Sequence, residues 1–386
     1  MSFTDNSIPS PCYVLEESLL RRNLALIKRV SEHAGVDIIL AFKAFALWKT
    51  FPIFREYGFR CTASSVHEVQ LAFDEMGCLA HAYSPAYSEE NFPVFMAYSS
   101  HITFNSIAQF NRFYPQIAAF GKQISCGLRI NPEYSEVGAD LYNPCAPGSR
   151  MGITAGQLNG TLPDGVEGIH FHTLCESTSY DLKKTLAVVE KRFGHLLKRV
   201  KWLNMGGGHL MTRKEYNTEH LIALLLTFKS RYPNLKIILE PGSAFAWETG
   251  YLLTTVVDVV ENNGIKTAII DASFSCHMPD CLEMPYKPVI RGAQYVGAST
   301  MMCHEKNRYR IGGCSCLSGD FIGDWYFEKP LEEGDTIIFE DMIHYTTVKT
   351  TLFNGIPHPS VAMIHANGVS EILRTFTYED YKSRMD

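Results

Sequence analysis

The chain has 386 residues, of which 46% are hydrophobic and 20% are charged, and its formal net charge is −6 at pH 7. A composition of this kind is that of an ordinary globular protein and can bury one large core or two medium ones. The mild negative charge argues against a general nucleic-acid-binding surface.

The sequence also predicts a compartment. The richest apolar run, L-I-A-L-L-L-T-F at 221–228, is too short to cross a bilayer. The first residues, M-S-F-T-D-N-S-I-P, lack a basic region followed by an apolar stretch, so no secretory signal is visible. The eleven cysteines follow no regular spacing, which indicates reduced thiols rather than a disulfide framework. We therefore expect a cytoplasmic protein without a membrane partner.

Short β-rich runs alternate with helical patterns through the first two thirds of the chain. An extended segment at 11–15 precedes a helical pattern that stops at Gly35. Eight β-rich runs follow, at 38–44, 59–65, 79–84, 101–106, 124–131, 166–173, 201–206 and 235–240. Eight strand–helix units predict an α/β fold, a closed parallel (β/α)8 TIM barrel, with an open doubly wound sheet as the alternative.

Beyond about residue 250 the pattern changes. Runs such as L-L-T-T-V-V-D-V-V and D-T-I-I-F-E are short and β-rich, and turn signals such as N-N-G and E-E-G-D join them. This pattern is typical of a second, mostly antiparallel β domain. The expected domains are a barrel at 16–250 and a β domain built from 1–15 and 251–386.

Lys43 is the one charged residue in the apolar run I-I-L-A-F-K-A-F-A-L at 38–47. Burial of an unpaired ammonium is unfavourable or lowers its pKa. Lys43 is therefore either a strand residue that points to solvent or a lysine that forms a Schiff base, for which a lowered pKa is useful. Active sites of such barrels lie at the carboxyl ends of the strands, where the predicted strands carry Lys43, Ser64, Ser65, Asn105, Arg129, Asn131, His172 and Glu240.

Two glycine-containing loops follow the last two predicted barrel strands. N-M-G-G-G at 204–208 contains Gly206, Gly207 and Gly208, which either form a plain turn or let backbone N–H groups approach a phosphate. L-E-P-G-S ends at Ser243 and is the matching loop. Glu240 closes an apolar strand and needs a partner, which is either an arginine or backbone amides, or else a protonated pyridine nitrogen. With Lys43 and a phosphate loop, the second choice describes a site for pyridoxal 5'-phosphate.

The segment I-H-F-H-T-L-C-E at 169–176 places His170 and His172 on one strand face. A histidine in a strand is usually a core residue with its hydrogen bonds satisfied. At the end of the strand, however, the imidazole of His172 could stack on a pyridine ring. Cys175 and Glu176 are candidate neighbours of a substrate or cofactor.

Several motifs in order carry a family resemblance. A-F-K-A-F, H-F-H-T-L-C-E, N-M-G-G-G-H, E-P-G-S, C-L-S-G-D and D-M-I-H-Y-T resemble the fold-type III pyridoxal-phosphate decarboxylases of the alanine racemase and ornithine decarboxylase kind. The likeness runs from Pro11 to near the C-terminus. L-Y-N-P-C-A-P-G-S-R-M-G, C-H-M-P-D and F-N-G-I-P look like the carboxynorspermidine (carboxyspermidine) decarboxylase group in particular.

The resemblance implies roles for individual residues. Lys43 would hold the cofactor and reprotonate the α-carbon after carbon dioxide leaves, His172 would stack on the ring, and Glu240 would hold the ring nitrogen. The phosphate would be bound by Gly206, Gly207, Gly208, Gly242, Ser243 and Tyr345. Related decarboxylases commonly carry Arg or Glu where this chain has Ser243, so phosphate binding there would rely on a hydroxyl and the backbone.

Similar enzymes are head-to-tail homodimers with two shared sites. The resemblance therefore implies that Cys316, as a catalytic residue, and Asp320 are supplied across a dimer interface. Five candidates for contacts with a substrate are Asp320, Asp280, Arg150, Glu176 and His277, for which the alternative is an ordinary surface or interdomain ion pair. Cys314 and Cys316 lack a second pair at zinc-site spacing, so no metal site is expected.

The implied reaction is decarboxylation of carboxynorspermidine or carboxyspermidine to norspermidine or spermidine in polyamine biosynthesis. One alternative is a diaminopimelate- or ornithine-type decarboxylase. Ser243, which stands where these enzymes commonly carry Arg, and the H-M-P-D motif argue against it. The other rival is a cofactor-binding regulatory homologue without catalysis, against which the retention of Lys43, Cys316 and Asp320 argues.

Overall fold

The computed structural model of the protein describes residues 7–283, 286–297 and 307–386. The chain folds as two compact units. One unit is Asn23–Phe245, and the other combines Met1–Arg22 with Ala246–Asp386. Among the described residues, no helix is both long enough and apolar enough to span a membrane.

The unit Asn23–Phe245 contains a parallel sheet that closes on itself. Its strands follow the spatial order β2-β10-β9-β8-β7-β6-β5-β4-β3, and only Ile39 separates the two end strands along the chain. The amide of Ile39 donates to Leu239 O at 2.9 Å, and the amide of Leu40 donates to Arg60 O at 2.9 Å, so the closing segment bonds to both neighbours. The predicted parallel barrel is confirmed, with its first strand split in two. The strands are β2 (Asp37–Ile38), β3 (Leu40–Ala41), β4 (Cys61–Ala63), β5 (Ala80–Tyr83), β6 (Ser99–Phe104), β7 (Ser125–Arg129), β8 (Val166–His170), β9 (Trp202–Asn204) and β10 (Lys236–Leu239).

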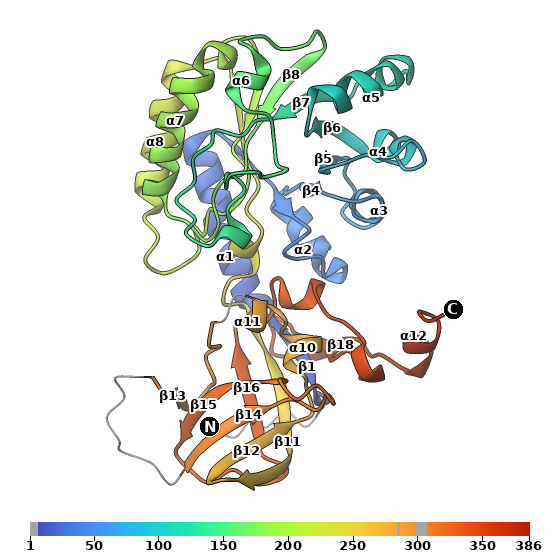
Figure 1. Ribbon diagram of the computed structural model, residues 1–386, viewed down its shortest axis with the longest axis vertical. Helices are drawn as coiled ribbons and strands as arrows, with labels where there is room; N and C mark the ends of the chain where they lie inside the picture. The colour runs from blue at the N-terminus through green and yellow to red at the C-terminus, as the bar shows by residue number, and fades with distance from the viewer. Residues whose placement is uncertain (1–6, 284–285, 298–306) are drawn as a thin grey trace. The chain divides into compact units, whose positions relative to one another are not determined.

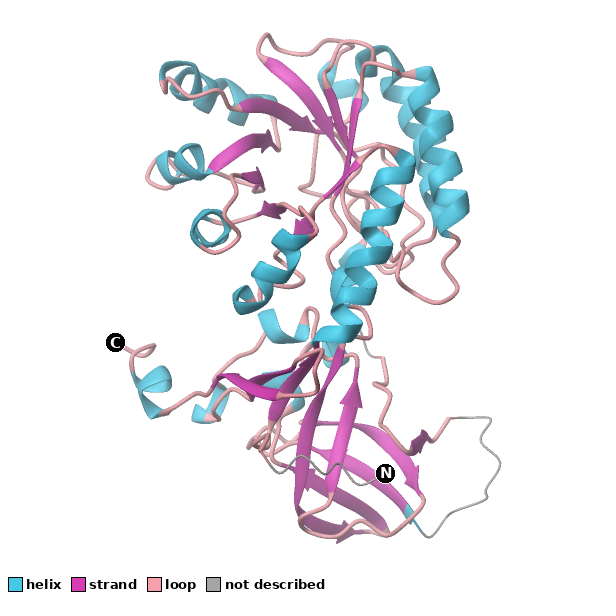
Figure 2. Cartoon of the chain, turned by 180° about the vertical axis from the view of Figure 1, so that it is seen from behind, coloured by secondary structure: helices cyan, strands magenta, loops and turns pink. Residues whose placement is uncertain are grey.

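Helices lie outside the barrel strands, as Figures 1 and 2 show. The predicted helix before the first barrel strand is confirmed, and Gly35 follows it with φ +61°, the left-handed conformation in which glycine commonly ends helices. The helices are α1 (Glu17–Ala34), α2 (Phe51–Glu56), α3 (Val66–Asp74), α4 (Phe92–Tyr98), α5 (Ile107–Ala119), α6 (Ala155–Leu158), α7 (Ser179–Leu197), α8 (Thr218–Arg231) and α9 (Ser243–Ala246).

Two serines at the carboxyl ends of strands act as helix caps. The side chain of Ser65 accepts a hydrogen bond from the amide of Glu68 at the start of α3, and Ser106 accepts one from the amide of Gln109 at the start of α5. A capping hydroxyl satisfies one of the four amides that a helix start leaves unpaired. Ser65 therefore orients α3 at the end of the barrel where the sequence predicts the site.

Trp202 packs across the neighbouring strands of the barrel. Gly127, Gly168 and Trp202 are directly paired across β7, β8 and β9. A Cβ atom added at Gly168 would overlap the indole ring, and one at Gly127 would stand 2.7 Å from Trp202 Cζ2. The indole N–H donates to Ser125 Oγ at 2.8 Å. The two glycines thus provide the space that the indole fills.

The other unit is mostly antiparallel, as predicted. Its strands follow the order β13-β15-β14-β12-β11-β1-β17-β18, and β16 also pairs with β11. Among the strands that the structure describes in this unit, only β1 with β17 and β12 with β14 run parallel. The strands are β1 (Cys12–Glu16), β11 (Gly250–Asn262), β12 (Ile265–Ile270), β13 (Ala293–Tyr295), β14 (Arg308–Gly312), β15 (Phe321–Phe327), β16 (Thr336–Glu340), β17 (Ser360–Ile364) and β18 (Ser370–Arg374), and the helices are α10 (Phe274–His277), α11 (Asp280–Glu283) and α12 (Tyr378–Lys382).

We expect the variant Gly168→Ala to destabilise the protein by about 1–3 kcal/mol, because its methyl group has to displace the indole of Trp202. The matched control is Gly156→Ala, on an exposed turn of α6 where an added Cβ meets nothing within 4 Å. Urea unfolding monitored by tryptophan fluorescence measures both variants. Equal midpoints for the two variants would contradict the packing account.

Candidate active site

Lys43, His172 and Glu240 follow three barrel strands at the same end of the sheet. Lys43 stands two residues after β3, His172 stands two residues after β8, and Glu240 follows β10 directly. The Nζ atom of Lys43 is 3.2 Å from Nε2 of His172. The structure therefore brings the predicted cofactor lysine and the predicted ring-stacking histidine into contact.

The tautomer of His172 is set by the backbone. The amide of Gly207 donates to Nδ1 of His172 at 2.8 Å. Burial lowers the pKa of His172 well below its usual 6.5, and the nearby charge of Arg129 acts in the same direction, so the ring is neutral. A neutral imidazole whose Nδ1 accepts a hydrogen bond carries its proton on Nε2. The Nε2–H group then faces Lys43 and requires a lone pair there, which only the neutral amine offers.

The surroundings of Lys43 favour the same neutral amine. Desolvation by surrounding protein atoms lowers the pKa of Lys43 below its usual 10.5, and the charge of Arg129 lowers it further, whereas Glu240, Cys175 and Glu68 act in the opposite direction. Lys43 keeps an accessible surface, so water can still reach the amine. The Nε2–H group of neutral His172 favours the uncharged amine in addition to the desolvation of Lys43 itself. An uncharged lysine amine is the form that attacks an aldehyde.

Glu240 is held as an anion. Its Oε1 accepts a hydrogen bond from Asn204 Nδ2 at 2.6 Å, and its Oε2 is 3.4 Å from Nε2 of His170. Burial alone would raise the pKa of Glu240, but the adjacent imidazole of His170 and the hydrogen bonds from Asn204 and Thr62 lower it below its usual 4.5. No arginine among the described residues forms an ion pair with it. The result is a buried carboxylate that suits a protonated ring nitrogen.

The three glycines after β9 are needed for close packing. A Cβ atom would overlap Phe171 O at Gly206, stand 2.5 Å from Glu240 O at Gly207, and overlap the carbonyl of Leu174 at Gly208. Gly206 and Gly208 also have φ values of +69° and +88°, which favour glycine. The amide of Gly206 donates to Asn204 Oδ1 at 2.9 Å and that of Gly207 to His172, so two amides of the predicted phosphate loop already have partners inside the chain.

The loop E-P-G-S lies against the segment that carries Lys43. A Cβ atom at Gly242 would stand 2.5 Å from Ala44 Cβ, and the amide of Ala41 donates to Pro241 O at 3.1 Å. Ser243 begins α9 and is partly exposed. Both predicted glycine loops therefore lie at the end of the barrel that holds Lys43.

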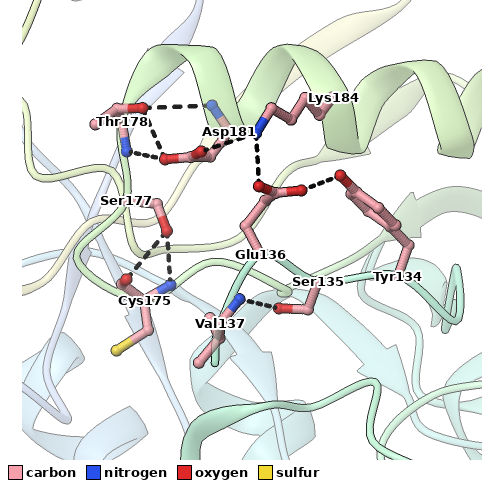
Figure 3. A network of polar contacts seen from close by, with 9 residues as sticks. All are labelled: Tyr134, Ser135, Glu136, Val137, Cys175, Ser177, Thr178, Asp181 and Lys184. Atoms are coloured by element: carbon pink, nitrogen blue, oxygen red, sulfur yellow. Dashed lines mark hydrogen bonds and ion pairs between the residues drawn. The ribbon is translucent and has the colours of Figure 1, made fainter. Parts of the chain in front are cut away.

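Figure 3 shows the polar contacts within the loop that carries Cys175 and those at the start of the helix that follows it. Ser177 Oγ donates to Cys175 O at 3.0 Å. Thr178 and Asp181 form a reciprocal cap at the start of α7, and Lys184 reaches from that helix to Glu136 at 2.6 Å. Cys175 and Glu176 are both exposed, and Glu176 has φ +44°. The fixed helix start thus presents these two side chains at the carboxyl end of β8.

Two arginines near this end of the barrel differ in environment. Arg150 is exposed, its guanidinium approaches Met151 Sδ at 3.2 Å, and none of the described carboxylates forms an ion pair with it. Arg129 is buried, donates to His172 O at 3.1 Å and lies over the ring of Tyr83 at 4.7 Å. Arg150 is therefore available to an anionic ligand, whereas Arg129 is built into the structure.

Cys316 and Asp320 belong to the other unit. The carboxylate of Asp320 is buried and accepts hydrogen bonds from the amides of Ser275 at 3.0 Å and Ser315 at 3.2 Å. The amide of Cys316 donates to Asn354 Oδ1 at 2.9 Å, and its side chain is exposed. Asp320 therefore shapes the loop that presents the Cys316 thiol, and its role as a substrate ligand stays a prediction.

Asp280 and His277 both have protein partners in the same unit. Lys349 forms an ion pair with Asp280 and a second one with Glu283. His277 is fully buried, and its Nδ1 accepts the amide of Ser273 at 3.1 Å. Burial lowers the pKa of His277 to about 4, so it is neutral at physiological pH. A substrate ammonium would have to share Asp280 with Lys349, and both residues stay predictions as substrate ligands.

Tyr345 occupies an unusual turn. Its φ and ψ are 47° and −51°, and the amide of Thr346 donates back to His344 O. This pattern is that of a γ-turn, which is rare and strained in proteins. Strained turns occur more often at functional positions, so the geometry is compatible with the predicted contact between Tyr345 and a phosphate.

Several contributors to the site carried no role in the sequence analysis. His170, Asn204 and Thr62 surround Glu240, and Glu68 faces Lys43. Two of them had a visible signal, because His170 alternates with His172 in the sequence and Asn204 is the first residue of the N-M-G-G-G segment. Thr62 and Glu68 had none, since contacts between different strands and helices decide their positions.

A family model described as "Pyridoxal-dependent decarboxylase, C-terminal sheet domain" matches residues 12–343. The chain belongs to the pyridoxal-dependent decarboxylases. The predicted cofactor, pyridoxal phosphate, is thereby confirmed, and the residues present fit it: an uncharged lysine amine, an anionic carboxylate and closely packed glycine loops lie at one end of the barrel.

Within the pyridoxal-dependent decarboxylases, the chain is similar over nearly its full length to enzymes that decarboxylate carboxylated polyamines. A carboxyaminopropylagmatine decarboxylase of Synechocystis sp. is 48% identical over 98% of this chain and 96% of the relative. A carboxynorspermidine/carboxyspermidine decarboxylase of Campylobacter jejuni is 39% identical over 98% of both chains. The crystal structure of carboxynorspermidine decarboxylase complexed with norspermidine from Campylobacter jejuni has a TM-score of 0.90 and 38% identity, covering 98% of this chain and 100% of that one.

The reaction of the apoenzyme with added pyridoxal phosphate reports the charge of Lys43. We expect the rate to rise with pH as the amine loses its proton, with a midpoint below 10.5 because desolvation lowers the pKa of Lys43. Stopped-flow absorbance measures this profile. Lys43→Ala, which lacks the amine, is the blank.

Two charge variants test the cause. Arg129→Met removes a cation that lowers the pKa of Lys43, so its midpoint shifts up. Glu68→Gln removes an anion that raises this pKa and keeps an oxygen for the Ser64 amide, so its midpoint shifts down. Shifts in the same direction would contradict the electrostatic account.

Proposed function

We propose that this decarboxylase removes the α-carboxylate of carboxynorspermidine or carboxyspermidine and yields norspermidine or spermidine. The observation that supports this substrate class most strongly is the near full-length likeness to the Campylobacter jejuni enzyme in its norspermidine complex. The proposed substrates are linear amines, and the exposed acid Glu176 beyond β8 offers a carboxylate to an ammonium group. Exposed Arg150 offers a guanidinium to the substrate carboxylate.

Bound pyridoxal phosphate supplies an aromatic ring that accepts the electron pair left when carbon dioxide departs. Glu240, held as an anion beside Asn204 and His170, would keep the ring nitrogen protonated. Lys43 would hold the cofactor through its uncharged amine, and its Nζ would carry the proton for the α-carbon. His172, fixed by the Gly207 amide, would lie against the ring and exclude water from it.

The loops that follow β9 and β10 would bind the phosphate. Gly206, Gly207, Gly208, Gly242 and Ser243 are the proposed ligands. Phosphate binding by Gly206 and Gly207 would compete with their present contacts to Asn204 and His172. Tyr345 of the other unit is the proposed hydroxyl donor.

A second substrate of the same class is favoured by one observation. The relative at 48% identity is a carboxyaminopropylagmatine decarboxylase, and agmatine ends in a guanidinium group rather than an ammonium group. A guanidinium binds a carboxylate through two parallel hydrogen bonds, which a single ammonium cannot form. The two candidate substrates therefore differ in the part that lies farthest from the reacting carbon.

Carbon dioxide release by the enzyme loaded with pyridoxal phosphate distinguishes these candidates. The panel is carboxynorspermidine, carboxyspermidine, carboxyaminopropylagmatine, diaminopimelate and ornithine, compared by kcat/KM. We expect turnover of the carboxylated polyamines and none of the last two. Turnover of diaminopimelate or ornithine alone would contradict the proposal, and silence from all five would favour a cofactor-binding regulator.

We also propose a head-to-tail homodimer in which Cys316 serves the site of the partner subunit. The exposure of the Cys316 thiol, on a loop held by Asp320 and Asn354, supports this arrangement. Asp320 would contribute to the same shared site, together with His277 and Asp280. Cytoplasmic location is part of the same proposal.

Mixing two inactive variants tests the shared site. Lys43→Ala and Cys316→Ala should each lose most activity, whereas an equimolar mixture that exchanges subunits should regain roughly a quarter of wild-type activity, because half of the dimers carry one intact site. Size-exclusion chromatography with light scattering checks that both variants dimerise. Absence of recovery despite subunit exchange would show that Cys316 acts within its own chain or not at all.

A further inference from the structure

Two thiols face each other inside the barrel unit, and neither has a role in the site described above. The Sγ atoms of Cys61 and Cys78 are 3.7 Å apart. Cys61 belongs to β4 and is fully buried, whereas Cys78 lies just before β5 and is partly exposed. A disulfide requires an S–S distance of about 2.05 Å, so a small approach of the two sulfurs suffices.

We infer that Cys61 and Cys78 form a thiol–disulfide exchange site, in which Cys78 is the attacking thiol and Cys61 the resolving thiol. In such a pair the attacking thiol is accessible and has a lowered pKa, whereas the resolving thiol lies beside it, and the two cysteines differ in this way. Cys78 can be reached from solvent, and the hydrogen bond from Cys61 and the charge of Arg60 lower its pKa. Cys61 has its pKa raised well above 9.0 by its hydrogen bond to Cys78 and by burial, so it is inert until a mixed disulfide forms beside it.

The exchange balances with a low-molecular-weight disulfide, such as oxidised glutathione, as oxidant. The Cys78 thiolate attacks one sulfur of the oxidant, which breaks the oxidant's S–S bond and releases one thiolate. Cys61 then loses its proton to solvent and attacks Cys78 Sγ, which releases the second small thiol. The two protein thiols give up two electrons and two protons, and the oxidant becomes two thiols.

The chain can accommodate the approach from the side of Cys78. Gly77 precedes it with φ +70°, and the nearest atom to a Cβ added there is Arg55 Cδ at 3.8 Å. Cys61, in contrast, is fixed in a strand that pairs with both β3 and β5. We therefore expect Cys78, which lies outside the strands, to move toward Cys61 rather than the reverse.

The bond would also affect the end of the barrel that holds the cofactor, a consequence that rests on the proposed function. Thr62 follows Cys61 in β4, and its hydroxyl hydrogen-bonds Glu240. If the disulfide displaces Cys61, the neighbouring Thr62 hydroxyl shifts as well. This hydroxyl is one of the hydrogen-bond donors that keep Glu240 anionic. We therefore expect the oxidised protein to hold pyridoxal phosphate about fivefold or more weakly, a coupling of ordinary size.

Mass spectrometry tests the bond without reference to any substrate, so its failure would leave the proposed function untouched. The protein is equilibrated in mixtures of reduced and oxidised glutathione, quenched with acid, and alkylated. No Lys or Arg lies between Cys61 and Cys78, so a glutamate-specific protease that cuts after Glu68 or Glu75 is needed to separate the two cysteines.

We expect a cross-linked peptide pair that lacks two hydrogens and disappears on reduction. Glutathionylated Cys78 without a cross-link, or free thiols in the most oxidising mixture, would overturn the inference. In the control Cys78→Ser, Cys61 should stay free in every mixture, and circular dichroism checks that this variant folds. Links among the exposed Cys175, Cys314 and Cys316 appear in other peptides.

Fluorescence titration of the apoprotein with pyridoxal phosphate, in its reduced and oxidised forms, tests the coupling. The dissociation constant should rise on oxidation in the wild type and stay constant in Cys78→Ser. A disulfide that leaves this constant unchanged in the wild type would overturn the link through Thr62.

Discussion

The hydrogen bond from the Gly207 amide to His172 Nδ1 determines the protonation pattern at the end of the barrel. It places the imidazole proton on Nε2, and this proton in turn requires an uncharged amine on Lys43 at 3.2 Å. The bond exists only because the loop after β9 comes very close to Glu240, where any side chain at position 207 would be 2.5 Å from the Glu240 carbonyl. Because Gly207 has no side chain, its backbone can pack against Glu240 and donate to His172, and this hydrogen bond favours the uncharged form of Lys43.

A second set of contacts fixes a charge of the opposite kind. Glu240 stays anionic in a buried position because Asn204 and His170 approach its two oxygens. Asn204 also accepts the amide of Gly206, so one side chain supports both the carboxylate and the glycine loop. The neutral amine and the anionic carboxylate are therefore maintained by neighbouring residues of a single loop, which explains why its sequence combines an asparagine with three glycines.

The sequence predicted the parallel barrel, the mostly antiparallel second part and the end of the barrel at which polar residues gather. Period-two and helical patterns are local, and the eight β-rich runs each overlap a barrel strand. The predicted strands extended too far at several carboxyl ends: the run at 38–44 breaks at Ile39 and ends at Ala41, and the run at 166–173 ends at His170. Apolar residues continue there, but the backbone leaves the ladder, so composition alone could not place the ends.

Partnerships between distant residues could not be predicted. Ser65 was a candidate site residue because of its position, and the structure makes it the cap of α3. Asp280 was a candidate for an ammonium ligand, and it already binds Lys349, which is 69 residues away. The support of Glu240 by Thr62 depends on the curvature of the closed sheet. Such contacts arise from the fold as a whole, whereas motifs report only short spacings.

The pairing of β1 has a consequence for the order of events during synthesis. β1 (Cys12–Glu16) lies between β11 and β17, and β17 (Ser360–Ile364) is almost the last strand of the chain. The unit that contains β1 therefore stays incomplete until the chain through Ile364 has left the ribosome. The unit Asn23–Phe245 is contiguous and has all its strands much earlier. During this interval β1 has no β17 to pair with, so the barrel can form before the pairing of β1 is complete.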